Sequence, residues 1–211
     1  MPTHESKCGC GRDLMGEDEC RFCRSRQVAW HSLSARIRAD LRKIHHPEEA
    51  IKADLDIIHE PLKGRGLYFC GPTGSGKTLY AAALLMASFD VAKIGGQKFF
   101  MALPDLLDSI KYTYNGRGGL EGTEGEIIQK YCSADLLVMD DLGVERTTDW
   151  SYNILNSIVS QRYGRLKSTI FTSNIDLDQL AAKLGDNRIS SRICQMCEVR
   201  LFDYKDMRVT L

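Results

Sequence analysis

The sequence predicts an α/β fold in which a mostly parallel central sheet carries helices on both faces. From about His59 to the end of the chain, short apolar runs of strand length alternate with longer segments of helical periodicity. Such alternation favours parallel strands joined by helical crossovers. A glycine-rich turn follows the first apolar run, and two carboxylates end a later one. Because ligands bind at these strand ends in open α/β sheets, the two turns are the first candidates for a site.

The chain is long enough for one domain with a real core and a small appendage. It has 211 residues, of which 43% are hydrophobic. Its 28 basic residues balance its 28 acidic ones, so the net charge argues neither for nor against nucleic acid. Between Cys20 and His46, however, only Asp40 opposes Arg21, Arg24, Arg26, Arg36, Arg38, Arg42 and Lys43. A contact with a polyanion is expected to begin in that segment.

Nothing in the sequence indicates a membrane span or an export signal. There is no run of 18 or more apolar residues, and the first residues, MPTHESK, are polar with no apolar segment behind them. A cytoplasmic, reducing location is therefore expected. In that environment clustered cysteines hold metal more often than they form disulfides.

Composition divides the chain into three segments: a cysteine-rich head at residues 1–26, a basic amphipathic helix and linker at 27–58, and the α/β body at 59–211. Pro47, after His46, is expected to break the helix. One apolar stripe at helical spacing consists of Trp30, Leu33, Ile37, Leu41 and Ile44. Two interpretations stay open: the stripe docks on the protein's own body, or it binds a partner helix.

The head has four cysteines in two close pairs, Cys8 with Cys10 and Cys20 with Cys23, separated by nine residues. Two such pairs suit one tetrahedral Zn²⁺ site. Because the head has few apolar residues, metal binding is expected to supply its folding energy. The alternative is a disordered tail with free thiols. The other cysteines are interpreted as core positions or as a coincidental pair: Cys70, Cys132, Cys194 and Cys197.

The body begins with a predicted strand at residues 67–70, a glycine-rich loop, and a helix at 78–90. The loop consists of Gly71, Pro72, Thr73, Gly74, Ser75, Gly76, Lys77 and Thr78. Its spacing is that of the phosphate loop, whose backbone N–H groups cradle phosphates while the lysine reaches the β and γ oxygens and the threonine binds Mg²⁺. A chance match is the alternative, but the flanking strand and helix are those the mechanism requires. The sequence thus predicts a nucleoside triphosphate site with Mg²⁺.

The later elements follow in alternation. Strands are predicted at residues 98–102, 135–139 and 168–172, and helices at 104–114, 126–131, 150–163 and 177–184. Pro104 suits a first helical turn. Five glycines between Asn115 and Gly125 predict a surface loop.

Two carboxylates, Asp140 and Asp141, end the second of these strands. In phosphoryl-transfer proteins with a phosphate loop, such an aspartate holds Mg²⁺, and Asp140 is assigned that role. Asp141 is assigned to orient or deprotonate the attacking water, with Glu145 as a weaker alternative base. A solvated turn is the competing interpretation, but the phosphate loop favours a functional one.

The motifs GPTGSGKT, LLVMDDLGVE and STIFTSN, in this order, make the chain resemble the AAA+ ATPases of the bacterial replicative helicase loader group, the DnaC and DnaI type. Transposition helper ATPases of the IstB type are close relatives of that group. The resemblance covers about residues 60–211 and implies a P-loop NTPase fold of the AAA+ class, ATP as the nucleotide, and no helical lid domain after the body. Many AAA+ proteins have glutamate where this chain has Asp141, which implies weak turnover.

The resemblance also implies roles for further residues. Asn174 matches sensor 1, which positions water near the γ-phosphate. Arg192, with Arg188 as the runner-up, matches the arginine finger that acts on a neighbouring subunit's nucleotide, so self-association through the ATP site is implied. Arg208 matches sensor 2. By residue type alone, Asn174 would end a strand and the two former arginines would lie on a solvated helix face.

The function that the resemblance implies is that of a helicase loader or DNA-replication accessory ATPase. Its implied partners are a replicative DNA helicase, engaged by the segment before the body, and single-stranded DNA. One alternative is an IstB-type helper ATPase that delivers a transposase to DNA. The other is a zinc-containing adaptor that uses ATP as a structural switch.

Overall fold

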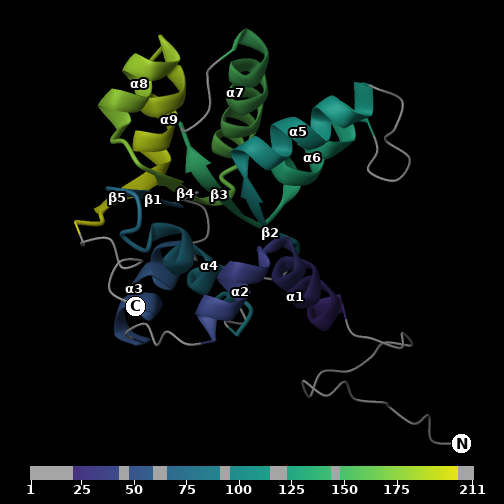
Figure 1. The fold of residues 1–211 in the computed structure, drawn as a ribbon, viewed down its shortest axis with the longest axis vertical. Helices are drawn as coiled ribbons and strands as arrows, with labels where there is room; N and C mark the ends of the chain where they lie inside the picture. The colour runs from purple at the N-terminus through teal and green to yellow at the C-terminus, as the bar shows by residue number, and fades with distance from the viewer. Residues whose placement is uncertain are drawn as a thin grey trace, which may run out of the picture.

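The computed structural model describes residues 21–42, 48–58, 66–90, 96–114, 123–143 and 148–203. They form a five-stranded sheet in the order β2-β3-β4-β1-β5, in which all neighbouring strands are parallel (Figure 1). The strands are β1 (Gly66–Cys70), β2 (Lys98–Ala102), β3 (Leu136–Leu142), β4 (Ser168–Ser173) and β5 (Cys197–Leu201). The predicted parallel α/β fold is confirmed. β3 continues past its predicted end at residue 139 and includes both aspartates.

Helices connect the strands and precede the sheet. They are α1 (Arg21–Ser32), α2 (Ala35–Leu41), α3 (Glu48–Ile58), α4 (Lys77–Ala87), α5 (Leu103–Tyr114), α6 (Glu124–Ser133), α7 (Asp149–Gly164), α8 (Leu177–Leu184) and α9 (Arg188–Met196). The sequence reasoning missed α3. Its signals were two glutamates in the first turn and apolar residues at spacings of four and three, Ile51, Leu55 and Ile58.

The helices cover both faces of the sheet, because successive side chains of a strand point to opposite faces. Leu67 and Phe69 of β1 belong to a buried cluster with residues of α1, α3 and α4. Tyr68 and Cys70 of the same strand belong to a second cluster with residues of α5 to α9. Figure 1 shows the two groups of helices on opposite sides of the sheet. The expected covering of both faces is thus confirmed.

The prediction of a single amphipathic helix after the head is wrong, because two helices, α1 and α2, occupy that segment. The helical conformation is interrupted at Ser34. Its hydroxyl accepts a hydrogen bond from the backbone N–H of Ile37 (3.3 Å) and so caps α2. Leu33 is buried in the hydrophobic cluster that includes residues of α4, and Trp30 and Leu41 pack against that cluster. The described part of the stripe therefore docks on the protein's own body.

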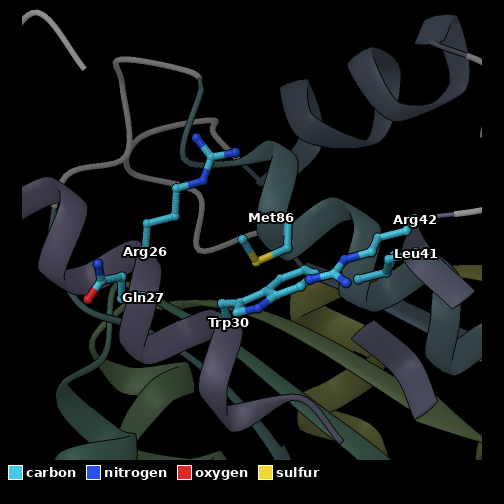
Figure 2. Close-up of a pocket in the computed structure, with 6 residues that line it drawn as sticks. All are labelled: Arg26, Gln27, Trp30, Leu41, Arg42 and Met86. Carbon is cyan, nitrogen blue, oxygen red and sulfur yellow. The ribbon is translucent and has the colours of Figure 1, made fainter. Parts of the chain in front are cut away.

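A surface groove lies beside the docked helices, between α1, α2 and α4 (Figure 2). Its volume is about 530 Å³, and its lining consists of Arg26, Gln27, Trp30, Leu41, Arg42 and Met86. The Arg42 guanidinium lies 5.6 Å from the centre of the Trp30 ring. Arg26 pairs with Asp90 at 3.0 Å. Arg26 thus contacts the body and Arg42 contacts α1, while both arginines stay exposed.

Some predicted residues lie outside the described part of the chain: Cys8, Cys10, Cys20, Ile44, Glu145 and Arg208. Cys23 belongs to the backbone of α1, which begins at Arg21 and therefore starts inside the predicted head. Among the described residues, no group of three or more His, Cys, Asp or Glu side chains could hold a metal ion. The zinc site stays a prediction. No helix in the described ranges is long and apolar enough to cross a membrane.

Candidate active site at the carboxyl edge of the sheet

The predicted phosphate loop joins β1 to α4, at the carboxyl edge of the sheet. Gly74 (φ 84°) and Gly76 (φ 93°) have left-handed backbone conformations that residues with a Cβ rarely adopt. Gly76 is also the N-cap of α4 and has no side chain to bond the first helical N–H groups. A helix N-terminus of this kind is suited to bind an anion.

Lys77 lies inside the loop and is only 5% exposed. Its ammonium donates hydrogen bonds to the carbonyl oxygens of Gly71 (2.8 Å) and Pro72 (2.7 Å) and to the hydroxyl of Ser75 (3.3 Å). The Ser75 hydroxyl in turn donates to the Pro72 carbonyl at 2.9 Å. These contacts hold the positive charge within the loop, as a phosphate-binding lysine requires.

The chain that follows β5 passes directly over the loop. Phe202 donates its backbone N–H to the carbonyl of Cys70 at 2.7 Å, and its ring packs on Phe69 and Tyr80 with centroid distances of 5.1 and 5.7 Å. A Cβ on Gly71 would lie 2.2 Å from the Phe202 carbonyl oxygen. The first glycine of the motif is therefore required by the close approach of a distant segment, as well as by its own φ of 150°.

Asp140, on β3, is buried next to the loop. Burial, with a smaller contribution from the neighbouring Asp141, raises the pKa of its carboxyl group to about 6, although hydrogen bonds from Thr172 and Thr78 and the charge of Lys77 oppose the shift. The hydrogen bond with Thr78 brings the carboxylate and the loop hydroxyl together. Mg²⁺ prefers such oxygen ligands, so these two side chains fit the ion assigned to them.

Asp141 has an unusual backbone conformation for a residue with a side chain, with φ at 57°. The pairing of β3 with β4 shifts register between Met139 and Leu142, so Asp141 lies in a bulge. Its backbone N–H donates to the hydroxyl of Thr172 at 3.0 Å. Strained conformations of this kind cost about 1–3 kcal/mol and occur preferentially at functional sites. The bulge ends the regular alternation of side chains and re-aims the carboxylate.

Asn174 follows β4, the strand between the two halves of the site. Ser173, the residue before it, pairs with Cys70 on one side and with Leu142 on the other. Asn174 is therefore next to both the phosphate loop and the exit of β3. The fold thus places Lys77, Thr78, Asp140, Asp141 and Asn174 at the same edge of the sheet, and the roles assigned to them stay predictions.

Three residues that the sequence reasoning missed bind the exit of β3. Thr172 contacts both aspartates, the Ser173 hydroxyl donates to the Leu142 carbonyl at 2.7 Å, and Lys183 of α8 donates to the Gly143 carbonyl. The available signal was the pair of hydroxyl residues directly before Asn174, at buried positions of a parallel strand where apolar side chains are usual.

Among the described residues, the bonds of Arg192 and Arg188 go to partners other than the acidic pair of their own chain. Arg192, on α9, donates to the side-chain oxygen of Asn156 on α7 at 2.9 Å. Arg188 is 61% exposed and pairs with Asp186 at 2.6 Å. The groups that act on Asp140 are Asp141 and residues of the phosphate loop, α4 and β4, with neither arginine among them.

A parallel sheet of this strand order, with a phosphate loop after β1 and an acidic pair on β3, defines a P-loop nucleotide-binding protein. The model of the IstB-like ATP binding protein family matches residues 53–207. The chain belongs to this family, within which the predicted likeness to AAA+ helicase loaders is confirmed by the relatives that follow.

The similar proteins include both replication and transposition proteins. The replicative helicase loader DnaC of Buchnera aphidicola is 30% identical over 121 residues, which cover 57% of this chain and 47% of that protein. The chain thus spans about half the length of this relative. A putative ATP-binding protein of insertion sequence IS1162 from Pseudomonas fluorescens is 26% identical over 166 residues, 78% of this chain and 68% of that one. A crystal structure of the DnaC helicase loader matches with a TM-score of 0.65 at 31% identity, over 80% of this chain and 99% of that one.

Proposed function

We propose that this protein is an ATPase that delivers a replicative DNA helicase to DNA. The observation that carries the enzymatic part is the convergence of Thr78, Asp140 and Asp141 beside Lys77, since these groups bind a nucleotide with its metal and can activate water. The part that concerns the helicase rests on the DnaC relatives, which match the fold and the sequence together.

In this proposal, Lys77 and the loop N–H groups bind the phosphates of ATP. Thr78 and Asp140 would hold Mg²⁺, which neutralises charge on the β and γ oxygens. The oxygen of a water molecule forms a bond to the γ-phosphorus while the bond from that phosphorus to the bridging oxygen breaks, which leaves ADP. Asp141 accepts the proton of this water, and Asn174 orients it. Because a shorter carboxylate does this work, turnover is slow.

Self-association completes the site. Arg192 supplies its guanidinium to the nucleotide of a neighbouring subunit, and its bond to Asn156, with no described bond to its own acidic pair, supports this role over one within the same chain. Arg208 contacts the nucleotide as sensor 2. In the assembled state, single-stranded DNA lies along the subunits and the segment before the body engages the helicase. The exposed arginines of α1 and α2 offer charge for such contacts.

The zinc proposal concerns the head alone. Cys8, Cys10, Cys20 and Cys23 hold one Zn²⁺ ion, which folds the segment before α1. Measurement of bound zinc in the purified chain tests it, with a variant in which Cys8 and Cys10 are both replaced by serine as the comparison. We expect one equivalent of zinc in the natural chain and none in the variant. An equal, near-zero content in both would leave the head as a tail with free thiols.

A second candidate function is delivery of a transposase, since the family model is named for IstB-like proteins and the sequence match to the IS1162 relative covers more of this chain than the sequence match to Buchnera DnaC does. Affinity capture from the native host separates the two. Recovery of a replicative helicase with the tagged chain supports the proposed function. Recovery of a transposase without a helicase would support the second candidate instead.

An ATPase assay separates both functions from an adaptor that only binds ATP. Phosphate release is measured for the natural chain and for Lys77→Ala, with and without single-stranded DNA. We expect DNA to stimulate the natural chain and to leave the variant at background. Equal background rates in all four samples, combined with ATP binding by the natural chain alone, would favour the adaptor.

A further inference from the structure

The hydroxyl of Thr172 bonds to both aspartates of the acidic pair. It lies 2.5 Å from Oδ1 of Asp140 and 3.0 Å from the backbone nitrogen of Asp141. The Asp141 N–H can only donate, so the Thr172 oxygen accepts that hydrogen bond. The single hydroxyl proton is then available to Asp140. One group thus fixes a side-chain oxygen of the first aspartate and the backbone of the second.

The surroundings of Thr172 leave its hydroxyl little freedom. The residue is fully buried on β4, opposite Phe69 of β1, and its β-branched side chain has few allowed rotamers in a strand. The Asp141 backbone that it binds is left-handed and lies in a bulge. A hydrogen bond that this backbone donates to a rigid, buried acceptor is the kind of contact that holds such a conformation.

The neighbouring Ser173 has a different task. Its hydroxyl donates to the Leu142 carbonyl (2.7 Å) and accepts from the N–H of Ile175 (3.2 Å). It therefore anchors the end of the bulge without either of these bonds reaching a carboxylate. The Thr172 hydroxyl thus bonds to the acidic pair, whereas the adjacent Ser173 hydroxyl anchors the end of the strand. Substitution of Ser173 therefore provides a matched control for substitution of Thr172.

We propose that Thr172 is a positioning residue: its hydroxyl sets Asp140 toward Mg²⁺ and, through the Asp141 backbone, sets the second carboxylate toward the attacking water. The proposal rests on the proposed ATPase function. It assigns Thr172 no contact with nucleotide or metal. Removal of the hydroxyl should therefore weaken metal-dependent steps while binding of the nucleotide without metal persists.

The test compares Thr172→Val, which keeps the shape and loses the hydroxyl, with Thr172→Ser, which keeps the hydroxyl, and with Ser173→Ala. Binding of a fluorescent ATP analogue is measured in EDTA and in a Mg²⁺ titration, and phosphate release gives kcat and KM. For Thr172→Val we expect EDTA binding within about twofold of the natural chain, at least a fivefold higher Mg²⁺ requirement, and a fall in kcat of at least tenfold with little change in KM. Thr172→Ser and Ser173→Ala should keep the natural Mg²⁺ requirement within about twofold.

A measurement on the natural chain needs no variant. Hydrogen exchange at the Asp141 amide, followed by NMR without nucleotide, should be at least 100-fold slower than in an unstructured peptide, because Thr172 accepts its hydrogen bond. Unprotected exchange would refute the contact and with it the proposal, even if Thr172→Val does not fold.

The outcomes separate this proposal from the proposed function. A natural chain that binds no ATP analogue would overturn both. If the natural chain binds and hydrolyses ATP while Thr172→Val keeps its Mg²⁺ requirement, the role of Thr172 alone is refuted. Equal losses in Thr172→Val and Ser173→Ala would also refute it, since they would show only a general need for an intact β4.

Discussion

The two halves of the candidate site are held by different kinds of contact. In the phosphate loop, Lys77 bonds to Gly71, Pro72 and Ser75, all within six residues of it. In the acidic half, each bond described for Asp140 and Asp141 comes from another element, and that from Thr172 spans more than 30 residues of sequence. The first half is built by local sequence and the second by neighbouring strands.

Because of this difference, we expect the two halves to be sensitive to different substitutions. A local loop tolerates changes elsewhere in the fold, and its glycines and lysine show directly in the sequence. The acidic half depends on β4 and on the strained backbone of Asp141. We therefore expect changes in the loop to remove nucleotide binding, and changes in the acidic half to spare binding and remove chemistry.

The largest effect is expected from a substitution in the phosphate loop. Lys77→Ala removes the only charge that bonds to the loop carbonyls within the described residues, and we expect affinity for ATP to fall by about 100-fold and hydrolysis to reach background. A fluorescent ATP analogue and phosphate release measure the two. Lys111→Ala, at an exposed lysine on α5, is the control and should change neither. Unchanged affinity in Lys77→Ala would contradict the role of the loop.

The next largest effect is expected from substitution of Arg192, which belongs to neither half of the site. Arg192→Ala should lower kcat about 1,000-fold at concentrations where subunits assemble, because the transition state loses a guanidinium. ATP binding should change little. When Arg192→Ala is mixed with Asp141→Asn, some interfaces combine an intact arginine with an intact acidic pair, and activity should return in part. Absence of any recovery in the mixture would argue against action between subunits.

Substitutions of Asp141 separate its chemical role from its backbone strain within the acidic half. Asp141→Asn and Asp141→Gly should each lower kcat about 100-fold, as expected for loss of a general base. ATP affinity should stay within about threefold. Only the glycine variant should gain stability, by about 1 kcal/mol, because it relieves the strain of a positive φ. Denaturant unfolding of both variants measures this gain, and equal stability of the two would show that the conformation is not strained.

The smallest effect tests the contact between the phosphate loop and the segment after β5. Gly71→Ala places a Cβ against the Phe202 carbonyl, and we expect a loss of about 2–3 kcal/mol in the free energy of unfolding. Gly164→Ala, at a position with nothing within 4 Å of the added Cβ, is the control and should be neutral or slightly stabilising. Similar stability of both variants in denaturant would mean that the segment after β5 can move away from the loop.

The sequence predicted the candidate site residues better than it predicted the tertiary contacts that hold them in place. Strands of the body were recognisable because both faces of a parallel strand are buried and their residues are therefore apolar. The bulge at Asp141 was not, since it arises from the pairing of β3 with β4, and two adjacent aspartates do not distinguish a bulge from an ordinary turn at the end of a strand. The break at Ser34 was missed because the stripe continues across it at helical spacing, while the capping hydroxyl was available as a signal.

By itself, the sequence determined the class of fold, the phosphate loop and the identity of the acidic pair, because these follow from hydrophobic periodicity and from local backbone chemistry. Three contacts could be seen only in the folded chain: Thr172 binds both aspartates, Phe202 lies against Gly71, and Arg192 of α9 bonds to Asn156 of α7. The physical reason is distance along the chain. Contacts between residues 30 to 130 positions apart depend on strand order and register, and no local pattern encodes them.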